Sequence, residues 1–351
     1  MNIKKKLLIF RIGSLGDTMV ALPALHLLRE KYPEHHFTLL TNSPVDGGIK
    51  ATASYHILNG SGLIDNYIEY KHNKLNIIDI CRLILTIICI RPDHVIYLMP
   101  PRSFMQRARD ALFFLLAGVF RIEGLFPGRY GNLHLATPDN LSWESEASRL
   151  VRSIGFNEQL LTQSLFTLKL TNEEYIDGKI TLEELNTTKK FIALSVGAKV
   201  PAKDWGTDRW IELLESLISL SDKYSLVFLG SQDEYQRCQK ILATWPHKSL
   251  NLCGKLTPRQ SAAVLANSHI FVGHDSGPMH LASSVAIPVV SIFASRDKHG
   301  IWFPFGNEKN VFYADVPCSN CKLSVCKDFE MICIRSIDPR KVSDKIKEVI
   351  L

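Results

Sequence analysis

The stretch whose residues point most clearly to chemistry is Gly273–Ala282, which reads Gly-His-Asp-Ser-Gly-Pro-Met-His-Leu-Ala. The run His269–Val272 leads into it and is typical of a buried strand, while Pro278 suits the first turn of a helix. At such a strand-to-helix turn, unpaired backbone N–H groups point into a crevice and the helix dipole adds partial positive charge. The segment therefore predicts an anion site, and a diphosphate is a typical guest of such a site.

A second turn rich in glycine lies near the N-terminus. The run Lys6–Phe10 indicates a strand, residues 11–17 (Arg-Ile-Gly-Ser-Leu-Gly-Asp) a turn, and Thr18–Lys31 a helix. Asp17, at the end of this turn, either caps the helix or acts as a general base that takes a proton from an attacking hydroxyl. The turn lacks the full glycine spacing of a dinucleotide fingerprint. Two such turns predict a protein that binds an anionic group in each half, with a cleft between the halves.

Other polar side chains also follow predicted strands. Lys203 lies in the loop after the strand 191–196, where it either meets a phosphate as a point charge or is simply solvated. Glu234 either accepts hydrogen bonds from ribose hydroxyls or begins a helix whose dipole favours an acid. Asp275 and His280 either bind the anion or serve the turn and the packing of its helix.

The charge pattern limits the class of partner. The net charge is +6, and the lysines and arginines are scattered without a basic run interleaved with aromatic residues. This excludes a typical nucleic-acid binder and favours an acidic substrate or an anionic membrane surface. Arg102, Arg107 and Arg109 follow the predicted strand 94–98, and they either bind an anionic acceptor or form a solvated helix face.

Half of the eight cysteines fall within sixteen residues, as Cys318-x2-Cys321-x4-Cys326-x6-Cys333. This spacing is compatible with tetrahedral ligation of Zn or Fe by four thiolates. Such a site would be structural, because four protein ligands leave no open position. Disulfides or four reduced thiols are the alternatives. We interpret the remaining cysteines as ordinary small apolar residues.

Apolar runs alternate with amphipathic stretches along both halves, which predicts an α/β protein with parallel sheets. The 351 residues, 46% hydrophobic and 22% charged, suit a soluble globular protein of two domains. We expect a first domain at 1–170, a linker region at 171–190 and a second domain at 191–351 that includes the Cys-rich segment 318–333. Strands are predicted at 7–10, 37–41, 67–70, 94–98, 191–196, 225–229, 270–273 and 288–293, and helices at 18–31, 77–90, 103–116, 143–154, 210–220, 233–242, 258–266, 279–284 and 339–350.

The sequence shows no convincing signal peptide, which favours a cytoplasmic protein. The longest apolar segment, residues 75–90, contains Asp79 and Arg82 and falls short of a membrane span. It is either a partly buried amphipathic helix or a helix whose apolar face touches a membrane.

Three sets of motifs together resemble glycosyltransferase family 9, the heptosyltransferases of bacterial lipopolysaccharide assembly. They are residues 7–25, residues 197–210, and a third set made of residues 254–257, 273–280 and 288–293. Their order and spacing extend over nearly the whole chain. A Cys-rich C-terminal segment also occurs in many members of that family.

The resemblance implies a GT-B fold, in which two Rossmann-like, doubly wound domains face an interdomain cleft. It implies an inverting transfer of heptose from ADP-heptose, a nucleotide-sugar donor, to a lipopolysaccharide core or related surface-glycan acceptor, with no cofactor required. Asp17 is then the general base. The expected donor-binding residues are Lys203, Glu234, Leu256, Thr257, Asp275, Ser276, Gly277, Pro278 and His280, and the expected acceptor-binding residues are Arg11, Gly16, Arg102 and Arg107. A glycolipid acceptor would bring peripheral contact with the inner membrane.

Two departures from the family pattern lie near the expected donor site. His274 stands where small or apolar residues are more usual, and Lys199–Ala202 replaces a polar loop. The alternatives keep the fold but use another nucleotide sugar or a protein hydroxyl, or bind a nucleotide sugar without catalysis. The presence of both Asp17 and Lys203 argues against a binding module. A dinucleotide oxidoreductase is disfavoured because no Gly-x-Gly-x-x-Gly follows a predicted strand.

Overall fold

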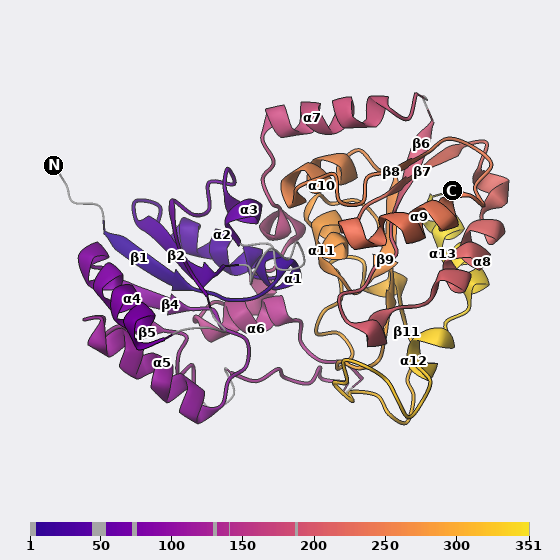
Figure 1. Ribbon diagram of the computed structural model, residues 1–351. Coiled ribbons are helices and arrows are strands. Elements are labelled where there is room, and N and C mark those ends of the chain that lie inside the picture. The colour runs from indigo at the N-terminus through magenta and orange to yellow at the C-terminus, as the bar shows by residue number, and fades with distance from the viewer. Residues whose placement is uncertain are drawn as a thin grey trace. The chain divides into compact units, whose positions relative to one another are not determined.

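The computed structural model describes residues 5–43, 54–71, 76–128, 132–139, 141–186 and 189–350. The chain divides into two compact units, unit 1 (Met1–Lys169) and unit 2 (Leu170–Leu351), and each has its own sheet (Figure 1). All strand pairs in both sheets are parallel within the described residues. The predicted α/β class with parallel sheets is therefore confirmed.

The sheet of unit 1 has the strand order β3-β2-β1-β4-β5. Its central strand is an apolar run in which Leu7, Leu8 and Ile9 are fully buried, as expected for a parallel strand covered on both faces. The strands are β1 (Lys6–Phe10), β2 (His36–Asn42), β3 (Asn66–Tyr70), β4 (His94–Tyr97) and β5 (Ile122–Glu123). The helices are α1 (Leu15–Met19), α2 (Leu22–Lys31), α3 (Ser54–Leu58), α4 (Ile77–Ile90), α5 (Phe104–Leu116) and α6 (Glu146–Ser153).

The sheet of unit 2 has the strand order β11-β10-β9-β6-β7-β8. Trp205 and Trp210 are fully buried in the core on one face of this sheet, with their rings 5.2 Å apart. The strands are β6 (Lys190–Ser195), β7 (Tyr224–Phe228), β8 (Ser249–Asn251), β9 (Ile270–His274), β10 (Val289–Phe293) and β11 (Val311–Tyr313). The helices are α7 (Asn172–Glu183), α8 (Thr207–Ser216), α9 (Tyr235–Leu242), α10 (Pro258–Leu265), α11 (Gly277–Ser284), α12 (Ile332–Arg335) and α13 (Pro339–Ile350).

The prediction of one helix at 18–31 is wrong in detail, because this stretch holds the end of α1 and all of α2. Asp17, expected at the end of a turn, lies inside α1. The helical conformation is interrupted between Met19 and Leu22. Pro23 then lies in the first turn of α2, where the N–H that proline lacks would have no partner within the helix.

The stretch 171–190, predicted as a linker, belongs to unit 2 and carries α7, which packs against α10. Thr171 begins this helix by accepting a hydrogen bond from the Glu174 N–H, and the Glu174 carboxylate accepts one from the Thr171 N–H in return. Arg259 of α10 then donates to both carboxylate oxygens of Glu174, at 2.5 and 2.7 Å. Gly178 is the buried residue of α7, so the helix lacks the apolar stripe that sequence reasoning needs.

We predict that Gly178→Ala lowers the free energy of unfolding by about 1–3 kcal/mol, because the added methyl group must push α7 away from α10. A Cβ at position 178 would lie 2.6 Å from the carbonyl oxygen of Ala263. Helix propensity alone predicts the opposite sign, a gain of about 1 kcal/mol. Chemical denaturation decides between the two, with Lys179→Ala on the exposed side of α7 as the matched control. A gain in stability for Gly178→Ala would contradict this close packing.

Candidate active site

The strand order of unit 2 reverses between β6 and β9. From β6 the chain proceeds to β7 and β8 on one side, and then returns to build β9, β10 and β11 on the other side. The loops that leave the carboxyl ends of β6 and β9 therefore diverge and leave a crevice between them, which is where open α/β sheets bind ligands. The sequence-predicted donor residues fall on these two loops, on the loops that follow β7 and β8, and in α11.

An ion pair joins the two diverging loops. Lys203, in the loop after β6, donates to Asp275, which directly follows β9. The ammonium of Lys203 also lies 3.8 Å from a carboxylate oxygen of Asp297, in the loop after β10. The side chains of Lys203 and Asp275 are 15% and 7% exposed, so the pair is largely shielded but keeps some contact with solvent. The structure thus brings together two residues that the sequence predicted separately.

Further cations surround this pair. Arg296 and Lys322 lie 2.7 and 2.8 Å from the carboxylate of Asp297. Burial alone would raise the pKa of Asp297, but the hydrogen bond from Lys322 and the charges of Lys203 and Arg296 outweigh it and lower that pKa. Sequence analysis missed Arg296, Asp297 and Lys322. Arg296 and Asp297 could have been found from the sequence, because they come just after the predicted strand 288–293.

His274, noted above as a departure from the family pattern, holds the Lys203 loop against β9. The backbone N–H of Trp205 donates to Nε2 of the fully buried imidazole at 3.1 Å. Nε2 is therefore the unprotonated nitrogen, and Nδ1 carries the proton that it donates to the carbonyl oxygen of Gly197 at 3.2 Å. Burial lowers the pKa of His274 to about 4, so the ring is neutral at pH 7.

The turn Asp275–Pro278 leads directly into α11. Ser276 stands at the N-cap with an extended backbone, and its buried Oγ has no hydrogen-bond partner within the described residues. Gly277 and Pro278 form the first turn of the helix. The half-buried first turn of this helix and the unused hydroxyl offer the donors that an anion needs. His280 lies deeper in α11, buried, with its ring 6.4 Å from that of Trp302.

Two glycines make room for the carboxylate of Glu234 at the ends of β6 and β7. A Cβ on Gly197 or Gly230 would lie 1.9 or 2.0 Å from its oxygens. One of these oxygens accepts a hydrogen bond from the Ser231 N–H at 3.1 Å, which fixes the side chain at the start of α9. Leu256 and Thr257 lie in the loop after β8, and the Thr257 hydroxyl caps α10 by accepting from the Gln260 N–H.

The strand order of unit 1 reverses in the same way, between β1 and β4. Arg11, the first residue after β1, spans this point with a fully engaged guanidinium. It donates to the carbonyl oxygen of Leu98, after β4, at 2.8 Å and to that of Asp17 at 2.7 Å. With 3% of its side chain exposed, Arg11 fixes the shape of the turn.

Asp17 lies in the first turn of α1. Its Oδ2 accepts hydrogen bonds from the N–H and the hydroxyl of Ser14, at 2.7 and 2.8 Å, so the carboxylate completes a capping box. Its Oδ1 lies 3.8 Å from the guanidinium of Arg11, and 27% of the side chain is exposed. Gly16 precedes it in the same helix. The prediction that Asp17 caps the helix is therefore correct, and its Oδ1 accepts no hydrogen bond from Ser14.

A buried charge network supports the Asp17 turn from α6. Arg149 donates to both carboxylate oxygens of Glu146 at 2.7 Å, while Arg11 and His134 approach to 3.5 and 2.9 Å. Burial alone would raise the pKa of Glu146, but the hydrogen bonds from Arg149 and His134 and the charges of both arginines lower it to about 2. Sequence analysis missed this network.

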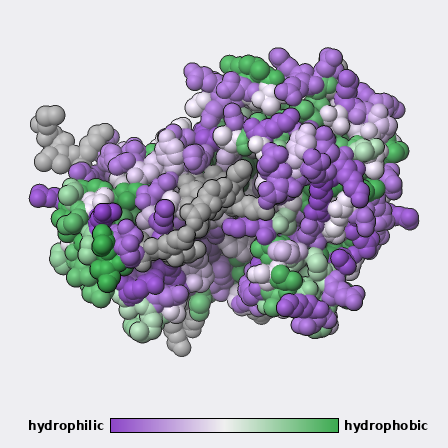
Figure 2. All heavy atoms as spheres, in the orientation of Figure 1, coloured by the Kyte–Doolittle hydropathy of each residue, from purple (hydrophilic) through white to green (hydrophobic). Residues whose placement is uncertain are grey.

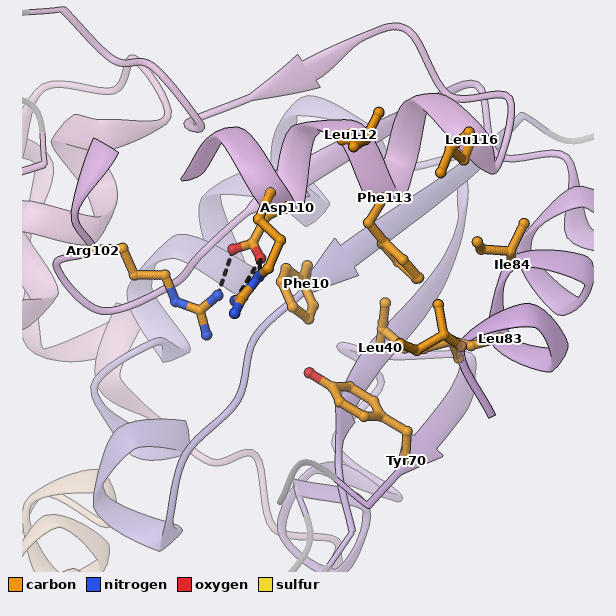
Figure 3. A pocket seen from close by; sticks show the side chains of 12 residues that line it. Phe10, Leu40, Tyr70, Leu83, Ile84, Arg102, Asp110, Leu112, Phe113 and Leu116 are labelled. Atoms are coloured by element: carbon orange, nitrogen blue, oxygen red, sulfur yellow. Dashed lines mark hydrogen bonds and ion pairs between the residues drawn. The ribbon is translucent and has the colours of Figure 1, made fainter. Parts of the chain in front are cut away.

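The predicted acceptor arginines have partners inside unit 1. Arg102 pairs with the buried carboxylate of Asp110 (Figure 3). That carboxylate also accepts a hydrogen bond from the Tyr97 hydroxyl at 2.6 Å. Arg107 donates to the carbonyl oxygen of Leu125 at 3.3 Å. Arg109 also contacts Asp110, but it remains 65% exposed and is the most accessible of the three.

The four clustered cysteines line one small cavity of about 20 Å³. The backbone N–H of Met331 donates to the Cys326 sulfur at 3.3 Å, and burial raises the pKa of the Cys333 thiol. Within the part of the chain that the structure describes, no three Cys, His, Asp or Glu side chains are arranged to hold a metal ion. The cysteines thus converge, but the geometry gives the predicted Zn or Fe site no support.

Comparison with known proteins identifies the family. The model described as glycosyltransferase family 9 (heptosyltransferase) matches residues 150–331, slightly more than half of the chain. The chain belongs to glycosyltransferase family 9. This match contains the Lys203 loop, Glu234 and the whole of the Asp275–Pro278 turn, whereas Asp17 and the acceptor arginines lie before it.

Individual relatives agree with the family. Lipooligosaccharide heptosyltransferase 2 of Campylobacter jejuni subsp. jejuni serotype O:6 is 26% identical over 171 residues, which cover 47% of this chain. The match spans 53%, about half, of the length of that relative.

Solved structures of family 9 show the same fold. A glycosyltransferase family 9 protein from Veillonella parvula DSM 2008 has a TM-score of 0.75 at 17% identity, covering 100% of this chain and 98% of its own. The ADP-heptose lipopolysaccharide heptosyltransferase II of E. coli has a TM-score of 0.69 at 20% identity, covering 98% of each chain. The predicted GT-B fold with two Rossmann-like units is therefore confirmed.

We predict that Glu146→Gln lowers the free energy of unfolding by about 3–5 kcal/mol at pH 7, because Arg11 and Arg149 lose their buried counter-charge. Glu123→Gln, which removes a partner of the exposed Arg121, should cost about 1 kcal/mol or less. Chemical denaturation of the two variants measures the difference. Equal losses of unfolding free energy in the two variants would show that the buried network stabilises the fold no more than an exposed ion pair does.

The same substitution should remove a pH dependence. The pKa of Glu146 is about 2 in the folded chain against an ordinary value of 4.5. A depressed carboxyl pKa adds stability that is complete above about pH 4.5 and is lost as the pH falls toward 2. The free energies of unfolding of the native chain and of Glu146→Gln, measured by chemical denaturation at several pH values, should therefore approach each other as the pH falls from about 4.5 toward 2. A difference in unfolding free energy that stays constant across this pH range would contradict the lowered pKa of Glu146.

Proposed function

We propose that this chain is an inverting glycosyltransferase that moves a heptose from ADP-heptose to a lipopolysaccharide core or a related surface-glycan acceptor. The observation that carries the proposal is the cationic crevice of unit 2, where Lys203 meets the Asp275–Pro278 turn at the point of strand reversal. Membership of family 9 supports heptosyl transfer, and the name of the E. coli relative specifies ADP-heptose as its donor.

Unit 2 would hold the donor. The diphosphate would lie against the first turn of α11, where the free backbone N–H groups, the Ser276 hydroxyl and Lys203 offer hydrogen bonds and positive charge. Arg296 and Lys322 add charge beside Asp297. Glu234 would accept hydrogen bonds from the ribose hydroxyls. These groups stabilise the negative charge that develops on the leaving diphosphate as the glycosidic bond breaks.

Unit 1 would bind the acceptor and supply the base. In an inverting transfer the acceptor hydroxyl attacks the anomeric carbon from the face opposite the diphosphate and loses its proton to a base. Oδ1 of Asp17 is the atom we assign to that proton, because Ser14 holds Oδ2 and so fixes the orientation of the carboxylate. Arg109, as the most exposed of the three arginines, is a better candidate for an anionic acceptor than Arg102 or Arg107.

The proposed reaction draws on no cofactor, since the cations that face the diphosphate are side chains. The cytoplasmic location stays a prediction, as does a structural metal at the four cysteines.

We predict that Asp17→Asn lowers kcat for transfer from ADP-heptose to heptose-deficient lipopolysaccharide core by about 10²–10⁴, the usual contribution of a positioned general base. Lys203→Met should lower kcat by about 10²–10³, the scale of one lost transition-state cation. Lys240→Met, an exposed lysine of α9, is the matched control and should retain activity.

Each alternative gives a distinct result in this assay. Transfer that survives Asp17→Asn removes Asp17 from the mechanism. Transfer from a different nucleotide sugar, with none from ADP-heptose, overturns the heptose assignment. Tight binding of ADP-heptose without transfer to any acceptor would identify a binding module.

A further inference from the structure

One face of unit 1 carries large apolar side chains that no other described element covers. Helices α4 and α5 lie next to each other over the sheet (Figure 1), and Figure 2 shows apolar side chains gathered over this region at the left of the view. The exposed fractions reach 80% at Ile77 and 60% at Leu85 on α4, and 76% at Met105 and 61% at Leu116 on α5. We call the exposed surface of these two helices the α4–α5 face.

Both helices present more apolar surface than the sheet needs. On α4 only Leu83 and Ile87 are buried, and on α5 only Asp110 and Phe114. A helix that merely covers a sheet has one apolar stripe, with polar residues on the opposite side. Here the solvent side is apolar as well, and a contiguous apolar surface of this kind marks an interaction site.

A pocket of about 350 Å³ opens between the two helices. Phe113 of α5 and Leu83 and Ile84 of α4 surround it, with Phe10 and Leu40 from the sheet (Figure 3). Arg102 and Asp110 lie at one end (Figure 3), together with Arg109, which contacts Asp110. The rest of the lining is aliphatic and aromatic. An apolar pocket with one charged end fits an amphiphile whose hydrocarbon chain lies between the helices.

The charges around this face favour an anionic partner. Residues 76–128 contain six arginines and no lysine, against four carboxylates. One of these carboxylates, Asp110, is buried and already paired with Arg102 and Arg109. Arginines at the edge of an apolar surface lay their stems along it and reach anionic lipid headgroups. A second copy of the chain would instead bring the same arginines opposite each other.

The helices are suited to lie on a bilayer rather than to cross it. The 14 residues of α4 span about 21 Å, less than the hydrocarbon core of about 30 Å. Among the described residues, no helix combines the length and the apolar character that a membrane span requires.

We propose that the α4–α5 face docks on an anionic lipid bilayer and that its pocket accepts one acyl chain of a membrane lipid. This inference goes beyond the proposed function, because docking on lipid can be measured without any glycosyl transfer. It gives the predicted membrane contact a location on α4, the described part of the apolar segment 75–90, which buries Leu83 and Ile87 and exposes other apolar side chains.

Flotation of the full chain with vesicles tests the docking. We expect binding to phosphatidylcholine mixed with phosphatidylglycerol, weaker binding to phosphatidylcholine alone, and a loss of binding as salt is raised. The double variant Leu112→Gln/Leu116→Gln should bind the mixed vesicles at least about tenfold more weakly. The matched control is Ile176→Gln/Ile180→Gln, since these residues of α7 are exposed to a similar degree, 57% and 54%.

A tryptophan reporter tests the acyl chain in the pocket. Phe113→Trp places an indole in the lining, and lipids brominated along their acyl chains should quench it beyond the quenching seen with the native chain. Vesicle binding without this extra quenching would overturn the pocket assignment.

The docking itself has two contrary outcomes. Equal losses in the α5 and α7 variants, or no vesicle binding at all, would overturn it. Self-association of the native chain that Leu112→Gln/Leu116→Gln abolishes, without binding to lipid, would show that the face is an interface between copies. Failure of the transfer assay with intact vesicle binding would count against the proposed function alone.

Discussion

The constraint on which both units depend is the reversal of strand order at the centre of each sheet. Parallel strands on either side of that point send their loops in opposite directions, which leaves a crevice between them. In both units a cationic side chain spans this point. In unit 1 the guanidinium of Arg11 reaches from the end of β1 to the carbonyl oxygen of Leu98, and in unit 2 Lys203 reaches from the loop after β6 to Asp275. Each candidate site is built around the cation that spans its reversal.

The cations that span the two reversals differ in how completely they are buried and paired. Arg11 is sealed among backbone carbonyls and the Glu146 network, so its charge shapes the turn and leaves Asp17 partly exposed. Lys203 is held by carboxylates at the edge of solvent, with Arg296 and Lys322 close by, so an incoming anion can share or displace these partners. A rigid turn beside a carboxylate suits a base, whereas a cluster of incompletely buried cations suits a diphosphate. The division of labour that we propose follows from this difference.

Sequence reasoning found what is local and missed what depends on a distant partner. Long apolar strands such as β1 and β9 were predicted nearly to the residue, and so was α4. The edge strands β5, β8 and β11 have two or three residues each and exist only through pairing with a neighbour. Lys203 and Asp275 could be proposed because each follows a predicted strand. Glu146 could not, because Arg11 lies 135 positions away and nothing near residue 146 signals a shared charge.

The hydrogen bonds of His274 also change how the unusual residues near the donor site should be counted. His274 and the loop Lys199–Ala202 look like two independent departures from the family pattern. The imidazole, however, holds both flanks of that loop, through the Gly197 carbonyl and the Trp205 N–H. The conformation of the loop therefore depends partly on a residue of the neighbouring strand β9. Residue 274 and residues 199–202 therefore act on the same loop conformation, and a loop transplanted from another family member would lack the imidazole that holds both of its flanks here.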